Sequence, residues 1–164
     1  LKQLLMTAEQ SQSSELQPQL LTVYFADLLE RWQLMRPTVE ANITMAHIEQ
    51  NGYFHPTIDQ SIINLLNNAA DASPKAVNID IDWDSQTATI NIRDQGPGLS
   101  PGQIEGLGQA FVSNKREGLG LGLFLSQASL TRFGGTVSLE NSPEGGTMTQ
   151  ITMPLQASST GDNP

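Results

Sequence analysis

Two asparagines one helical turn apart, Asn64 and Asn68, are the first residues whose type and spacing could do chemistry. The apolar spacing of residues 56–72 predicts a helix, and side chains at i and i+4 of a helix share a face. A carboxamide oxygen is a neutral, hard ligand that suits Mg²⁺, which keeps several waters and takes further ligands from phosphates. Three other short polar side chains share this predicted face: Thr57, Ser61 and Asp71. A solvated face is the alternative, but such faces usually carry Glu, Lys and Gln, which favour helix.

A second candidate is Asp94, which directly follows a predicted strand and begins an Asp-x-Gly-x-Gly run with Gly96 and Gly98. A carboxylate in this place could accept a hydrogen bond from an exocyclic amine such as that of adenine. The two glycines would then allow the backbone to approach a flat base closely. Because Gly-Pro pairs are common in tight turns, a purely structural turn is the alternative.

A third candidate is an alternation of glycine and leucine that opens a predicted helix. It consists of Gly118, Leu119, Gly120, Leu121 and Gly122. The backbone N–H groups at a helix N-terminus bind phosphate, so this run could form a flexible phosphate cradle, and a flexible hinge is the alternative. Upstream of it, Phe111 could anchor a loop that folds over a ligand. Lys115 could supply a point charge for a phosphate.

The elements that must position these residues follow from the apolar periodicity. Helices are expected between Pro18 and Pro37, over 56–72, and over 121–133, where Gly134 and Gly135 stop the last one. The buried stripe predicted for the second helix is Ile58, Ile62, Leu65, Ala69 and Ala72. Strands are expected over 39–48, 77–83, 87–93, 136–141 and 147–155, with a turn at Asn51–Gly52. This mixture predicts a two-layer α/β sandwich, with helices on one face of a mixed sheet.

Composition limits the classes of function. The 164 residues include no cysteine, which excludes disulfides and thiolate metal sites. The net charge of −9 argues against a nucleic-acid partner, because that binding depends on Lys and Arg. No apolar run approaches the roughly 20 residues that cross a bilayer, so we expect a cytoplasmic domain without direct membrane contact. The chain lacks an initiating methionine, so we expect it to come from a longer protein.

The order of these motifs resembles the N, G1, F, G2 and G3 boxes of sensor histidine kinases, a family in the gyrase, heat-shock-90 and MutL class of ATPases. The matching residues are 64–68, 94–98, Phe111 with Lys115, 118–122, and Gly145-Gly146-Thr147. The resemblance covers about residues 37–155 and implies the Bergerat fold, a mixed sheet backed by helices. The runs 111–115, 118–126 and 132–135, with Trp32 to Pro37 upstream, are similar to redox-responding kinases of the RegB/PrrB type.

The resemblance implies ATP and Mg²⁺ as cofactors. It implies that Asn68, with Asn64, binds Mg²⁺ and phosphate, and that Asp94 reads the adenine amino group. Lys115 and the glycines at 118–122 would hold the phosphates, and Thr147 would lie behind the adenine. The implied ATP site also includes Asp71, Gly96, Gly98, Phe111, Leu119 and Leu121.

The sequence departs from the related hydrolytic ATPases at one position. In the gyrase, heat-shock and MutL branches, a glutamate one turn before the metal-binding asparagine acts as the base for water. Here that position is Asn64, and an amide is no general base, so transfer of the γ-phosphate to a histidine is favoured over hydrolysis. Neither His47, expected on a strand, nor His55, which precedes a proline, has the context of a phosphoacceptor.

The acceptor is therefore expected on a separate dimerisation domain. We expect residues 1–17 to be the end of a dimerisation helix and a linker, 18–155 the ATP-binding catalytic domain, and 156–164 a disordered tail. The expected partners are the dimerisation and phosphoacceptor domain and a cognate response regulator, within an inner-membrane sensor. The alternatives are a nucleotide-gated interaction module without phosphotransfer and a hydrolytic ATPase of the same fold.

Overall fold

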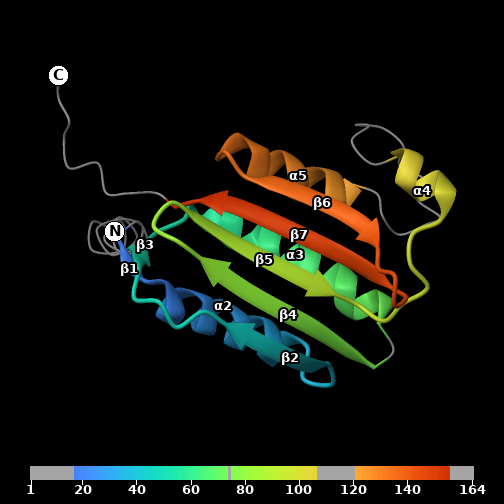
Figure 1. Ribbon diagram of the computed structural model, residues 1–164, viewed down its shortest axis with the longest axis horizontal. Helices are drawn as coiled ribbons and strands as arrows, with labels where there is room; N and C mark the ends of the chain where they lie inside the picture. The colour runs from blue at the N-terminus through green and yellow to red at the C-terminus, as the bar shows by residue number, and fades with distance from the viewer. Residues whose placement is uncertain (1–16, 74, 107–120, 156–164) are drawn as a thin grey trace, which may run out of the picture.

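The fold is a five-stranded mixed sheet with three helices packed against one face. The computed structural model describes residues 17–73, 75–106 and 121–155. The strand order is β2-β4-β5-β7-β6, in which β2 runs parallel to β4 and the other neighbours are antiparallel. The strands are β2 (Glu40–Met45), β4 (Ala76–Trp83), β5 (Thr87–Arg93), β6 (Thr136–Asn141) and β7 (Thr147–Pro154). This is the predicted two-layer α/β sandwich (Figure 1).

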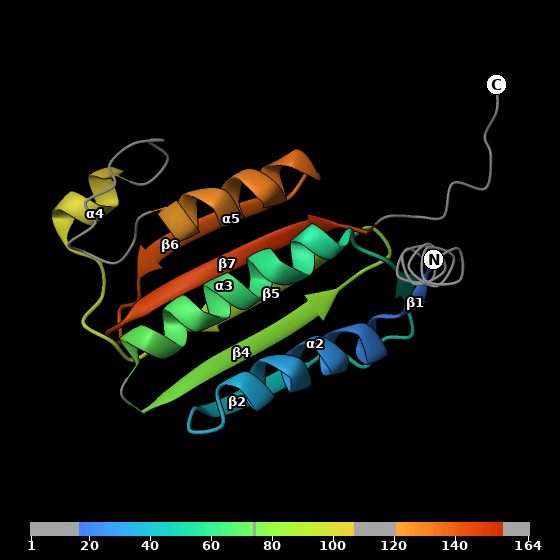
Figure 2. The same ribbon diagram turned by 180° about the vertical axis from the view of Figure 1, so that it is seen from behind.

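The helices α2 (Leu21–Met35), α3 (Pro56–Ala72) and α5 (Leu121–Arg132) form the second layer. Seen from behind, all three lie in front of the sheet, with α3 between α2 and α5 (Figure 2). A short helix, α4 (Pro101–Gly106), stands to one side, and two short strands, β1 (Gln19–Leu20) and β3 (Asn51–Gly52), pair with each other. No helix in the described residues has the length and apolar character needed to span a bilayer.

The core lies between the helices and the inner face of the sheet. The strands alternate as predicted: Ile79 and Ile81 of β4 are buried, whereas Asp80 and Asp82 point to the outer face. The largest fully buried side chains, with less than 2% exposure, are Trp32, Phe25, Leu21 and Leu28 of α2, Ile62, Leu65 and Leu66 of α3, Leu130 of α5, and Ile79, Ile90, Ile92 and Ile151 of the sheet. Burial of apolar area on this scale is the main force that holds the two layers together.

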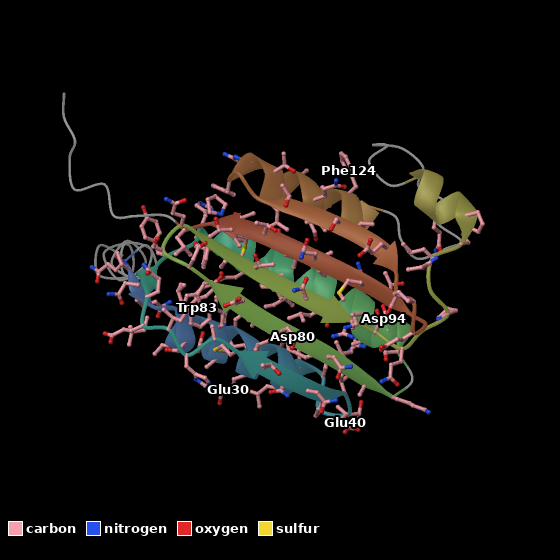
Figure 3. All side chains as sticks on the ribbon, in the orientation of Figure 1. Glu30, Glu40, Asp80, Trp83, Asp94 and Phe124 are labelled. Atoms are coloured by element: carbon pink, nitrogen blue, oxygen red, sulfur yellow. The ribbon has the colours of Figure 1, made fainter. Side chains whose placement is uncertain are left out.

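The two ends of the sheet differ in what they carry. Leu155 donates a backbone hydrogen bond to Gln86 before β5, and a Cβ on Gly52 would meet the side chains of Leu21 and Leu155. The chain therefore enters and leaves the described domain at the same end. Asp94, which follows β5, lies at the opposite end, as its separation from Trp83 shows (Figure 3).

Four details of the predicted elements are wrong. Asn51–Gly52 is a strand rather than a turn, because β1 pairs with it. β2 ends at Met45, so His47 is not on a strand. Ser61 is buried, since its hydroxyl donates to the Thr57 carbonyl 3.0 Å away and needs no solvent. Ala72 is exposed, because it is the last residue of α3, where the chain leaves the sheet.

Candidate nucleotide-binding site

Asp94 is buried and held by backbone hydrogen bonds in the predicted site. Its side chain is 6% exposed, and its Oδ1 accepts hydrogen bonds from the backbone N–H groups of Gly96, at 2.9 Å, and Thr147, at 3.1 Å. The backbone N–H of Asp94 also donates to the Thr147 carbonyl. Within the described residues, Oδ2 has no hydrogen-bond partner and is not sealed from solvent. One carboxylate oxygen is thus fixed by the backbone, and the other is open to a donor such as an amino group.

Two glycines make this arrangement possible by their lack of a side chain. A Cβ on Gly146, where φ is +78°, would lie 2.1 Å from the Asp94 carbonyl oxygen. A Cβ on Gly96 would lie 2.5 Å from the carbonyl oxygen of Ala72 at the end of α3. The sequence had suggested that Gly96 lets the backbone approach a ligand. In the structure it also lets the Asp94 loop approach α3.

The loop after Asp94 is tied to β6. Asn141 accepts from the Leu99 N–H through Oδ1 at 2.6 Å and donates to the Leu99 carbonyl at 3.1 Å. Gly98, with a φ of +79°, makes the turn before Leu99. Ser73 accepts from the Gln95 N–H at 3.0 Å, which joins the same loop to the residue after α3. No sequence pattern pointed to Asn141 or Ser73, because each contact joins distant parts of the chain.

The polar face of α3 is more open than the Asp94 site. Asn64 and Asn68 are half-buried, and Asp71 is exposed. The side-chain oxygen of Asn64 accepts a hydrogen bond from Gln60 at 3.0 Å. The side chain of Asn68 makes no hydrogen bond within the described residues, so its amide is available to a ligand. The predicted helical spacing is confirmed, because α3 runs unbroken from Pro56 to Ala72.

Two contacts tie this face to α2. The guanidinium of Arg36 forms an ion pair with Asp71 Oδ1 at 2.5 Å, and the indole N–H of Trp32 donates to Asn67 Oδ1 at 3.1 Å. No pattern in the sequence predicted these pairings.

Residues of this end of α3 fit a hydrated divalent cation chemically. Asn64 and Asn68 place two amide oxygens on one helix face, and Mg²⁺ prefers such oxygen ligands together with water and phosphate, whereas the Asp71 carboxylate beside them is paired with Arg36. In the described residues no cluster of three or more His, Cys, Asp or Glu side chains could hold a metal. A metal bound here would therefore depend on the amides and on oxygens of the nucleotide.

Several predicted site residues lie outside the described residues: Phe111, Lys115, Gly118, Leu119 and Gly120. Leu121 and Gly122 open α5, as expected from the glycine alternation. Thr147 begins β7, is 7% exposed and lies directly against Asp94.

A separate hollow of about 370 Å³ lies at the other end of α3. Tyr24, Arg31 and Asp59 line it. Asp59 accepts a hydrogen bond from Tyr24 and forms an ion pair with Arg31. Burial raises the pKa of Tyr24 well above its usual value, and the neighbouring Asp59 carboxylate raises it further. This hollow is not the nucleotide site, because α3 separates it from Asp94.

The two histidines have ordinary environments. His55 caps α3 by accepting from the Thr57 N–H through Nδ1 at 3.2 Å, and its ring stacks on Phe133 at 4.6 Å between centroids. His47 is exposed beyond the end of β2.

The buried Asp94 follows the central strand β5 and lies on a mixed sheet backed by helices, which is not the parallel sheet of a Rossmann or P-loop domain. The chain belongs to the family described as histidine kinase-, DNA gyrase B- and HSP90-like ATPases, whose model matches residues 55–157. This confirms the family that the motif order predicted.

Curated relatives are sensor kinases. The chain is 31% identical to the sensor protein KdpD of Escherichia coli strain K12 over 133 residues, which is 76% of this chain and 15% of KdpD. It is 33% identical to the sensor histidine kinase RegB of Cereibacter sphaeroides over 100 residues, 54% of this chain and 22% of RegB. A RegB kinase is thus among the relatives, as the sequence runs suggested. The chain spans less than a quarter of the length of either kinase.

Solved structures agree on the fold. The mycobacterial sensor histidine kinase MprB matches with a TM-score of 0.65 and 24% identity, covering 85% of this chain and 99% of that one. The histidine kinase domain of the E. coli osmosensor EnvZ matches with a TM-score of 0.64 and 21% identity, covering 91% and 94%. The fold is therefore that of histidine kinase ATPase domains.

Proposed function

We propose that this domain binds Mg-ATP and transfers the γ-phosphate to a histidine on a separate dimerisation domain of a two-component sensor kinase. The family supplies ATP as the nucleotide. The proposal for transfer rests on one observation: the position one turn before Asn68 holds the amide of Asn64, which bonds to Gln60 and cannot take a proton from water. The carboxylates on α3 offer no substitute base, because Asp59 is engaged by Arg31 of α2 and Asp71 by Arg36, which follows α2.

In this proposal each predicted site residue has a defined role. Asp94 accepts a hydrogen bond from the adenine amino group through Oδ2, while Gly96, Gly98 and Thr147 shape its loop. Asn68, with Asn64 beside it, provides amide oxygen for Mg²⁺, and Mg²⁺ supplies charge neutralisation of the phosphates when bound. Lys115 and the glycines at 118–122 complete the phosphate site. The chemistry is then mainly positioning, with the γ-phosphate kept from water until a histidine reaches it.

The proposed partners follow from this chemistry. A domain with no described histidine in an acceptor setting must receive one from elsewhere, since His55 serves as a helix cap. We infer that the dimerisation domain of the parent protein supplies it, and that a response regulator receives the phosphate. The parent protein is then a membrane sensor kinase, with this domain on the cytoplasmic side.

The test is to incubate the purified domain with Mg-ATP labelled at the γ-phosphate, alone and with a separately prepared acceptor-helix domain of the parent protein. We expect acid-labile, alkali-stable label on the acceptor domain only. Label retained on this domain alone would contradict the proposal. Release of inorganic phosphate without any transfer would favour a hydrolytic ATPase, and nucleotide binding with neither product would favour an interaction module.

A further inference from the structure

Two of the polar contacts that join α3 to α2 and its C-terminal cap lie at the Asn68 end and have matching spacing. The Trp32 indole bonds to Asn67, and the Arg36 guanidinium bonds to Asp71, so both partners advance by four residues on each helix. The backbone N–H of Arg36 also caps α2 by donating to the carbonyls of Trp32 and Gln33, at 3.0 and 3.2 Å. Because its backbone is fixed and its side chain is only 30% exposed, Arg36 reaches Asp71 from a defined position.

Asp71 presents a charge problem on its face of α3. It lies three residues after Asn68 and seven after Asn64, so the three side chains share the face that the proposed function assigns to a metal and a triphosphate. An isolated carboxylate there would repel the phosphates, and the domain as a whole already carries a charge of −9. A cation beside Asp71 removes that repulsion.

Among the described residues, other arginines do not serve this face. Arg31 pairs with Asp27 and Asp59 near the start of α3, and Arg93 pairs with Asp80 and Glu144 on the outer face of the sheet. Arg132 lies over the ring of Phe133 at the end of α5. Arg36 is the cation that pairs with Asp71 at the Asn68 end of α3, whereas Lys75, exposed after the end of α3, forms no ion pair within the described residues.

We propose that Arg36 is a positioning residue of the nucleotide site, which neutralises Asp71 and holds its carboxylate toward α2. This inference rests on the proposed function, because it assumes that the Asn64–Asn68–Asp71 face receives the phosphates. Arg36 acts through Asp71 and need not touch the nucleotide. Trp32, one turn earlier, fixes the separation of the two helices that the ion pair needs.

Arg36→Met removes the charge and keeps most of the side-chain length. We expect the affinity for Mg-ATP, measured by calorimetry, to fall about tenfold, the lower range for loss of a group that orients a metal site. The loss should be smaller for Mg-ADP, which has one phosphate fewer, and should shrink at high salt as repulsion is screened. Arg36→Lys should retain most of the affinity, because it restores the positive charge.

The chain offers a matched control in the second ion pair between the same two helices. Arg31 lies 3.5 Å from Asp59, and Asp59 is twelve residues before Asp71, or about 18 Å along α3. Arg31→Met should therefore change thermal stability about as much as Arg36→Met does, but leave Mg-ATP affinity within about twofold. A purely structural role for Arg36 predicts the same affinity for both variants.

The decisive variant combines Arg36→Met with Asp71→Asn. If uncompensated charge on Asp71 causes the loss, the double variant regains at least half of the decrease in the logarithm of Mg-ATP affinity that Arg36→Met produces. If the double variant binds no better than Arg36→Met, or if Arg36→Met binds like Arg31→Met, the inference is overturned. Should Arg36→Met not fold, Arg36→Gln, which keeps a donor for Asp71, serves in the same comparison.

The outcomes also separate this inference from the proposed function. If the unsubstituted domain does not bind Mg-ATP, the proposed function itself fails. If that domain binds Mg-ATP and Arg36→Met binds equally well, only the role of Arg36 fails.

Discussion

The two halves of the candidate site are built in different ways. Around Asp94 the contacts come from the backbone: two N–H groups donate to one carboxylate oxygen, and Gly96 and Gly146 allow neighbouring backbone segments to pack closely. At the α3 end, the amide of Asn68 is half-buried and without a hydrogen bond in the described residues, and Asp71 is exposed. Under the proposed function, recognition of the base would therefore be organised before a ligand arrives, whereas the phosphate end would be completed by a cation and by the nucleotide.

The largest effect expected on the backbone-built half comes from Gly146→Ala. The new Cβ would lie 2.1 Å from the Asp94 carbonyl oxygen, at a φ of +78°. We expect a loss of about 3 kcal/mol in unfolding free energy, from overpacking and backbone strain together, measured by urea denaturation. ATP binding should fall as well, because Asp94 must move.

The neighbouring Gly145 is a matched control. Its φ is +95°, but a Cβ there meets nothing within 4 Å. Gly145→Ala should therefore cost only about 1 to 2 kcal/mol from the backbone conformation. Equal losses in the two variants would show that the contact with Asp94 is not tight.

Asp94→Asn tests base recognition without loss of the fold. Asparagine can keep Oδ1 as the acceptor of the two backbone hydrogen bonds, but it then presents an NH₂ group to the adenine amine. A lost hydrogen bond to a charged group is worth roughly 1.5–3 kcal/mol, or about 10- to 150-fold in affinity. Calorimetry with ATP and GTP checks this, and discrimination against GTP should fall too. Unchanged ATP affinity would leave Asp94 as a turn residue only.

Asn68→Ala sharpens the contrast at the α3 end. Alanine favours helix over asparagine, so the domain without ligand should gain some tenths of a kcal/mol, on the order of 0.5. Mg²⁺ should no longer strengthen ATP binding, while weak Mg²⁺-independent binding through Asp94 persists. The measurement is ATP affinity with and without Mg²⁺ for both proteins. The same Mg²⁺ enhancement in the variant would remove Asn68 from the metal site.

The smallest expected effect on stability comes from Asp84, a carboxylate that holds the turn between β4 and β5 and lies outside the candidate site. The backbone N–H groups of Gln86 and Thr87 donate to it and lower its pKa below the usual 3.8. The unfolded chain therefore binds a proton more readily, so this contribution to stability is present above about pH 4 and is lost as the pH falls further. Asp84→Asn should slightly flatten the acid side of the stability profile and leave ATP affinity unchanged. A change in affinity would link this turn to the site.

The sequence predicted local features well and long-range contacts poorly. The bounds of α3 and β5 agree with the prediction, because apolar spacing and flanking turn residues act within a few residues. The position of Asp94 directly after β5 agrees with the prediction, and its role in binding adenine stays a prediction. The ion pair of Arg36 with Asp71 joins residues 35 positions apart, and the two hydrogen bonds between Asn141 and Leu99 join residues 42 positions apart. Local sequence patterns do not predict such pairings. Ser61 was misplaced for a different, local reason: its hydroxyl bonds to the carbonyl of Thr57 in its own helix and can therefore be buried like an apolar group.

The distance between Leu155 and Asp94 has a mechanical consequence. Leu155 and Gly52 meet at one end of the sheet, and the seven residues of β5 place Asp94 about 23 Å away. If a neighbouring domain held the sheet at the Leu155 end, a rotation of about 10° about that end would move Asp94 by about 4 Å, over the length that the strand rise gives. A small change in angle at that end would then become a large displacement at the candidate nucleotide site.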